Sequence, residues 1–173
     1  MKIKEAFDIY FRKLNEIYTK TFNSSPSASW SPDINQDLFV SAPDEDGEAR
    51  WKPILGHPLC LPELCDELNQ FYGSYYFCVL NGLYDHVQYY FEPIDSLQTA
   101  KKKAKQAVLD GEYYFKNQKA VLLASCSKAG NDDLLLFYNQ ETNSLFLYDR
   151  DKRFIFPLEF TLVQLISQME ALI

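Results

Sequence analysis

The sequence is poor in the residues on which catalysis most often depends. Histidine occurs only twice, at His57 and His86, and glycine occurs only six times in 173 residues. Gly111 and Gly130 are isolated from other glycines, so the chain has no glycine-rich loop that could cradle a phosphate group. These absences argue against nucleotide-dependent chemistry, and we expect a protein that is not an enzyme.

Long apolar runs and an excess of positive charge are missing as well. No stretch approaches the length of a membrane span, and Met1–Lys4 leads into an amphipathic pattern, with no signal-peptide core after it. Seventeen basic residues stand against 24 acidic ones, for a net charge of -7. The basic run Lys101–Lys103 is best interpreted as the solvated side of a helix. We therefore expect a cytoplasmic protein that binds neither nucleic acid nor lipid directly, because both are anionic.

The four cysteines form no dense framework. Cys60, Cys65, Cys78 and Cys126 lie in or beside apolar runs, which predicts reduced, buried thiols. Although His57 lies close to Cys60 and Cys65 in sequence, a structural zinc site needs a tighter pair of cysteines. We expect no metal ion and no cofactor.

One arrangement could still support catalysis. Cys78 and His86 are expected at the two ends of a hairpin, where a thiol and an imidazole could form a cysteine hydrolase. Cys78, however, lies among aromatic residues, and a thiol in apolar surroundings has a raised pKa and is inert. A structural role for Cys78 is the favoured interpretation.

The pattern of apolar residues predicts a single α+β domain over residues 1–173. Steps of three and four residues predict helices near 3–22, 61–72, 95–110 and 161–172. Aromatic and β-branched runs predict strands at 75–80, 87–91, 120–126, 134–138, 145–148 and 154–156. Asn81-Gly82 is expected to form a turn, and Asp110-Gly111 is expected to end the third helix. The expected architecture is an antiparallel or mixed sheet covered by about four helices.

Residues 24–59 form a proline-rich, irregular and acidic segment within this domain. Short strands are expected at 38–40 and 49–51, with an acidic cluster at the exposed tip between them. An acidic surface without catalytic chemistry suggests a protein that binds a basic partner, although charge runs often only keep a loop soluble. The residues predicted to contact the partner are Asp44, Glu45, Asp46, Glu48, Trp30 and Trp51, with Asp132 and Asp133 as a weaker second patch.

Several short motifs follow one another in a recognisable order. They begin with Trp30-Ser31-Pro32 and Trp51-Lys52-Pro53, continue through Phe71-Tyr72-Gly73 and the apolar strand 119–125, and end at Pro157-Leu158-Glu159-Phe160. In this order the chain resembles the Syd proteins of the SUKH superfamily along nearly its whole length. The family's Gly-Val-Pro-Ser-Pro segment is replaced here by residues 39–43, Phe-Val-Ser-Ala-Pro.

The resemblance implies a binding module without catalytic activity. Syd proteins attach to the bacterial inner membrane through a protein partner, because an acidic face of theirs meets the basic cytoplasmic loops of the SecY channel. Other SUKH members are immunity proteins that neutralise toxins, often nucleases. Binding to SecY is therefore the leading expectation and binding to a cognate toxin is the alternative. The sequence gives no sign of the oligomeric state.

Overall fold

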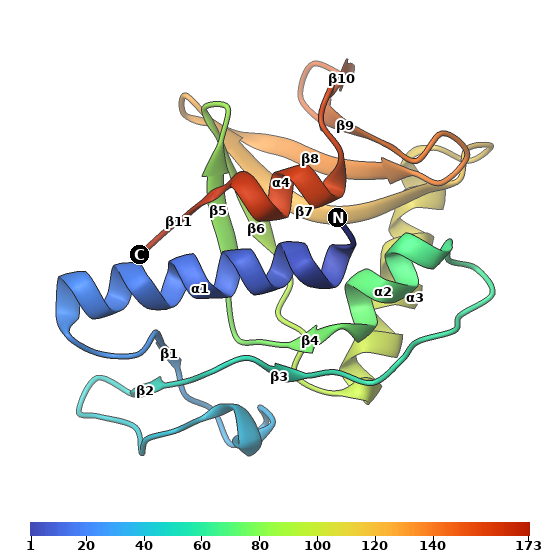
Figure 1. Ribbon diagram of the computed structural model, residues 1–173. Helices are drawn as coiled ribbons and strands as arrows, with labels where there is room; N and C mark the ends of the chain where they lie inside the picture. The colour runs from blue at the N-terminus through green and yellow to red at the C-terminus, as the bar shows by residue number, and fades with distance from the viewer.

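A seven-stranded antiparallel sheet forms the centre of the fold (Figure 1). The computed structural model describes residues 1–173. The sheet order is β10-β9-β8-β7-β6-β5-β11, and each pair of neighbours is antiparallel. The strands are β5 (Leu80–Tyr84), β6 (Val87–Phe91), β7 (Ala120–Lys128), β8 (Asn131–Asn139), β9 (Ser144–Asp149), β10 (Phe154–Pro157) and β11 (Glu170–Ala171). The predicted α+β class with an antiparallel sheet is confirmed.

Four helices pack around this sheet: α1 (Ile3–Phe22), α2 (Asp66–Gly73), α3 (Leu97–Tyr114) and α4 (Leu162–Gln168). In Figure 1, α1 and α4 lie in front of the sheet, and α3 lies behind α2. The apolar stripe of α1 is buried, including Phe7, Tyr10 and Leu14. The amphipathic pattern therefore predicted the face of α1 that packs on the core.

Both faces of the sheet are buried over much of its area. Along β8, Leu134 and Leu136 belong to the main core of 37 buried residues. The alternate residues Leu135 and Phe137 belong to a second, smaller cluster, because successive side chains of a strand point to opposite faces. Phe115, the residue after α3, packs edge-on against Phe137 with ring centroids 5.0 Å apart. The sheet is thus packed on both faces, and this packing holds its edge strands in place.

Two glycine predictions were wrong, and both glycines are explained by close packing. Asn81 and Gly82 lie within β5, and the turn falls at Asp85 and His86, both with positive φ. A Cβ atom on Gly82 would lie 2.5 Å from the side chain of Met169. Gly111 lies inside α3 and does not end it. A glycine is required at this position because the helix passes close to the backbone of β7.

A small lobe lies apart from the large sheet, at the bottom of Figure 1. It contains β1 (Ser27–Ser29), paired with β2 (Glu48–Arg50), and the 3-10 helix η1 (Gln36–Leu38). The expected strand at 38–40 is reduced to one antiparallel bridge, between Phe39 and Trp51, because the side chain of Asn35 accepts a bond from the backbone of Asp37 and caps a 3-10 turn that includes Leu38. Next in the chain, β3 (Ile54–Leu55) pairs with β4 (Tyr75–Tyr76).

Candidate functional site

The lobe formed by residues 27–52, which we call the acidic lobe, concentrates the negative charge of the chain. It holds two basic residues, Arg50 and Lys52, and six acidic ones, so its net charge is -4 of the total of -7. The three ion pairs of the protein all lie elsewhere. The acidic residues of the lobe are Asp33, Asp37, Asp44, Glu45, Asp46 and Glu48. Their charge is therefore not neutralised by a nearby cation and acts on the surrounding solvent.

Asp44 has a structural role within the acidic tip. Its carboxylate accepts the backbone N–H groups of Asp46 at 2.9 Å and Glu48 at 3.0 Å. Its own N–H donates to the carbonyl of Glu48 at 2.8 Å, and Gly47 supplies the positive φ that the turn needs. Glu45 and Asp46 are exposed at the apex, and Glu48 is half-buried. The turn thus holds neighbouring carboxylates in a fixed arrangement.

The acidic lobe is tied to the rest of the fold at two points. Trp51 is fully buried, and its ring meets Phe11 of α1 edge-on at a centroid distance of 6.2 Å. At the second point, Asn35 donates its backbone N–H to the carboxylate of Asp95 at 2.8 Å and its side-chain amide to the Asp95 carbonyl at 2.9 Å. A partner that docks on the lobe would therefore meet a surface that is already ordered.

The two tryptophans lie in different environments. Trp30 is 36% exposed, and its indole N–H donates to the side chain of Gln36 at 3.0 Å. Its ring is thus available on the surface of the acidic lobe. Trp51 belongs to the core, so its side chain is not available to a partner and forms no part of the contact surface.

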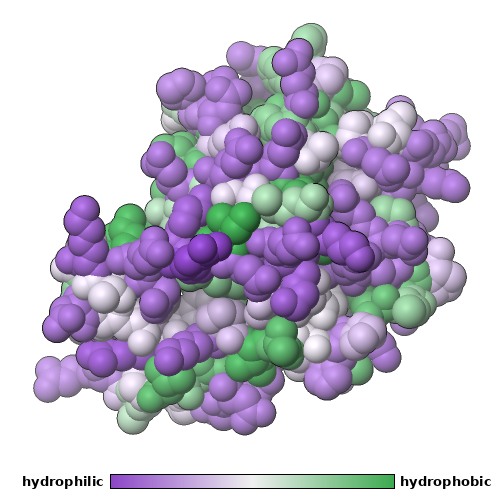
Figure 2. Space-filling view, in the orientation of Figure 1, coloured by the Kyte–Doolittle hydropathy of each residue, from purple (hydrophilic) through white to green (hydrophobic).

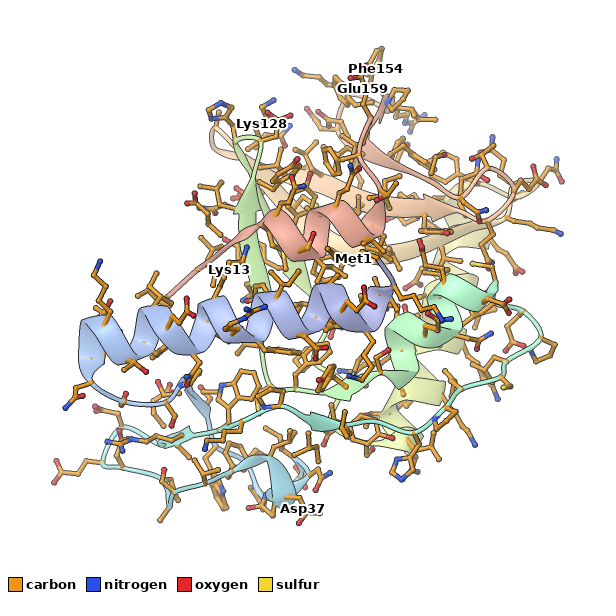
Figure 3. All side chains as sticks on the ribbon, viewed as in Figure 1. Met1, Lys13, Asp37, Lys128, Phe154 and Glu159 are labelled. Atoms are coloured by element: carbon orange, nitrogen blue, oxygen red, sulfur yellow. The ribbon has the colours of Figure 1, made fainter.

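Asp132 and Asp133 lie far from the acidic lobe. They are the second and third residues of β8, close to the turn that follows Lys128 in the upper part of Figure 3, whereas Asp37 of the lobe is at the bottom. Asp132 accepts a bond from Ser127 at 2.6 Å, and Asp133 pairs with Arg150 at 3.5 Å. The two predicted patches therefore cannot form one contact surface.

The structure separates Cys78 and His86. Cys78 precedes β5, and His86 lies in the turn that follows β5, so a five-residue strand of roughly 17 Å separates them. Burial raises the pKa of the Cys78 thiol to about 12, which keeps it in its unreactive neutral form. His57 is engaged elsewhere, because its Nδ1 lies 2.7 Å from the hydroxyl of Tyr76.

The structure contains neither a cluster of metal-binding side chains nor a helix that could span a membrane. No three or more His, Cys, Asp or Glu side chains converge where they could hold a metal ion. None of the helices combines the length and the apolar character that crossing a membrane requires.

A groove that the sequence did not reveal runs between α3 and the sheet. It encloses about 480 Å³, with Leu122 and Leu135 among its apolar lining residues and Tyr90 among its aromatic ones. Two lysines and two acidic residues also line it, so its charge is balanced and it does not extend the acidic surface. These charged residues are Glu92, Lys102, Lys103 and Asp110. The pattern of the Lys101–Lys103 run indicated only a solvated helix face, because a groove depends on how α3 sits on the sheet.

Comparison of the sequence with protein-family models and with curated proteins finds no match. The resemblance to Syd proteins therefore stays a prediction drawn from the order of short motifs.

Proposed function

We propose that the protein is a non-enzymatic binding module whose acidic lobe docks on a basic protein surface. The observation that carries this proposal is the concentration of six carboxylates without an ion pair on an ordered lobe. Retaining unpaired like charges close together disfavours the compact state, and a cationic partner would relieve that repulsion. Complementary charge of this kind speeds encounter and rejects acidic competitors.

The leading partner is the basic cytoplasmic side of the SecY channel, as the resemblance to Syd proteins implies. In that role the protein would be cytoplasmic and would reach the inner membrane only through its partner. A cognate toxin of the nuclease type is the alternative, because an enzyme that acts on an anionic substrate presents a basic surface. Both partners would use the same lobe, so one set of variants tests both.

The test is a charge reversal that leaves the turn intact. Glu45→Lys, Asp46→Lys and Glu48→Lys together reverse the tip, while Asp44 is kept because it holds the turn. We expect association with detergent-solubilised SecY, measured by surface plasmon resonance at low salt, to slow by at least about tenfold. The salt dependence of the remaining binding should become shallower, because fewer charges are screened.

A matched control makes the same change of charge elsewhere. Glu16, Glu112 and Glu141 are exposed and lie outside every ion pair, so their reversal to Lys should alter association much less. Equal losses in both triple variants would show that only net charge matters and would contradict a site on the lobe. If wild-type protein does not bind SecY but rescues cells that express a cognate toxin, the partner is the toxin.

A further inference from the structure

The free edge of the large sheet carries an unusual apolar segment. On the edge strand β10, the side chains of Phe154, Ile155 and Phe156 are 55%, 40% and 42% exposed. Natural edge strands are usually protected by charge, by proline or by a covering element. Apolar residues reach the surface at the top of Figure 2, where Figure 1 shows β10. An edge of this kind is a template for pairing with another strand.

The register of β10 shows which backbone groups are free. The N–H of Leu158 donates to the carbonyl of Leu145 at 3.0 Å, and Phe154 and Phe156 lie opposite Asp149 and Leu147. Since hydrogen-bonded and non-bonded pairs alternate along an antiparallel ladder, the N–H and C=O of Ile155 point away from β9. Pro157 has only a carbonyl to offer on that side.

The sequence Phe154-Ile155-Phe156 is symmetric about Ile155. This symmetry indicates that the strand that pairs with the β10 edge is another β10. We propose that β10 pairs antiparallel with β10 of a second copy of this chain, with Ile155 opposite Ile155 across a two-fold axis. The free N–H of each Ile155 then donates to the free C=O of the other. Each Phe154 comes opposite Phe156 of the second copy, and because these two rings already share one face at a centroid distance of 4.6 Å, four phenylalanine rings gather there.

Charge complementarity supports the same pairing. The β9–β10 turn carries the exposed residues Lys152 and Arg153 beside a single exposed acid, Asp151. Beyond the other end of β10 lies Glu159, also exposed and outside every ion pair. Figure 3 labels Phe154 and Glu159 at the top of the molecule, at opposite ends of β10. In this register Arg153 and Lys152 of each copy come opposite Pro157 and Leu158 of the other, and Asp151 comes opposite Glu159. The turn as a whole, with two cations and one anion, therefore presents net positive charge beside Glu159.

The turn itself is held in one conformation. The buried carboxylate of Asp149 accepts the backbone N–H groups of Asp151 at 3.0 Å and Lys152 at 3.1 Å, and it also accepts the amide of Asn131. These bonds, chiefly the one from Lys152, lower the pKa of Asp149, so the carboxylate stays charged at neutral pH. A turn ordered in advance reduces the entropy that pairing would cost.

The pairing would stop at a dimer and would be weak. Pro157 has no N–H to donate and its opposite residue, Arg153, lies in the turn with a positive φ, so the backbone contribution is limited to the two bonds at Ile155. Three apolar residues per copy also bury less than the roughly 1,200 Å² of a standard interface. The opposite edge of the sheet is the two-residue strand β11, which offers little to extend. A two-fold contact also consumes both β10 edges, so no filament results.

Sedimentation velocity on the full chain tests the proposal, from about 10 µM to about 1 mM. The wild-type protein should shift from monomer towards dimer as concentration rises. Ile155→Pro should abolish the shift without changing the melting temperature of the monomer, because the N–H it removes bonds to no other strand. Phe154→Lys should do the same. The matched control Phe22→Ser alters another exposed phenylalanine, 59% exposed on α1, and should leave the dimer unchanged.

A charge swap distinguishes pairing between two copies of the chain from the binding of a different partner at the β10 edge. Glu159→Lys alone, and Lys152→Glu with Arg153→Glu, should each weaken self-association by about tenfold or more. An equimolar mixture of the two variants should form heterodimers, because the β9–β10 turn of each variant then faces a residue 159 of opposite charge in the other. A wild-type chain that stays monomeric throughout overturns the proposal, even if the same residues bind anionic vesicles or a different protein. Dimerisation that survives Ile155→Pro overturns it too.

Discussion

Gly111 shows how a single position can reverse an ordinary helix preference. Replacing a glycine inside a helix by alanine normally stabilises the helix by up to about 1 kcal/mol. At Gly111, however, the new Cβ would lie 1.8 Å from the carbonyl oxygen of Ala120. The atoms that the new Cβ would meet are all backbone atoms of β7, which cannot rotate away as a side chain could, so steric repulsion outweighs the helix preference.

We therefore expect Gly111→Ala to lower the free energy of unfolding by about 2 kcal/mol or more, measured by urea denaturation. Leu109→Ala, at a side chain 57% exposed on the same helix, serves as the control and should be nearly neutral. A stabilised Gly111→Ala variant would show that α3 can move away from β7.

At the level of the secondary-structure elements, the sequence predicted the features that depend on residues close together in the chain. The stripe of α1, the apolar run of β7 and the capping box of Thr161 with Gln164 all appear as expected. The second helix begins only at Asp66. It does not include Leu61 and Leu64, which lie in a turn whose backbone bonds to the side chain of Asn69.

The candidate site could be predicted only in part. The acidic run is a local feature, and its exposure at a turn followed from its composition. The burial of Trp51 and the distance between the lobe and Asp133 depend on long-range packing, which sequence spacing does not contain. Tryptophan is common both in cores and at interfaces, and only the contact of Trp51 with Phe11 decides between the two.

Lys13 joins two helices that are far apart in sequence. Its ammonium donates to the carbonyls of Ser167 and Met169, at 2.8 Å each, where the end of α4 leaves carbonyls without helical partners. Lys13→Met keeps the aliphatic stem and removes both bonds. The expected cost is about 1–3 kcal/mol of unfolding free energy.

Chemical denaturation measures this loss against Lys20→Met, an exposed lysine of the same helix that should tolerate the change. Equal stability of the two variants would mean that water satisfies the end of α4 as well as Lys13 does.

For the whole molecule, the buried thiols and phenols make stability depend on alkaline pH. Burial raises the pKa of Cys78 from 9.0 to about 12 and also raises those of Cys126, Tyr10 and Tyr72. Above about pH 9 the unfolded chain loses these protons while the folded chain keeps them. The unfolded state then binds fewer protons, so stability falls as pH rises.

We expect the melting temperature to decline steadily between about pH 9 and about pH 12, the window set by Cys78. Cys78→Ala should make this decline shallower, because one of the buried titrating groups is gone. The same slope in Cys78→Ala and in the wild type would indicate that Cys78 titrates alike in the folded and unfolded chains.

The partnership of α1 with α4 also has a consequence for synthesis on the ribosome. Residues 3–22 are made before the residues that cover them. Phe7 and Phe11 pack on Phe77, whereas Lys13 bonds to the carbonyls of Ser167 and Met169, which are made much later. In a nascent chain the part of the helix that holds Phe7 and Phe11 can be covered once residue 77 has been added, but the part that meets α4 stays accessible until residues 162–168 follow. Apolar surface that is exposed in this way favours aggregation of the partly folded chain until α4 has packed on α1.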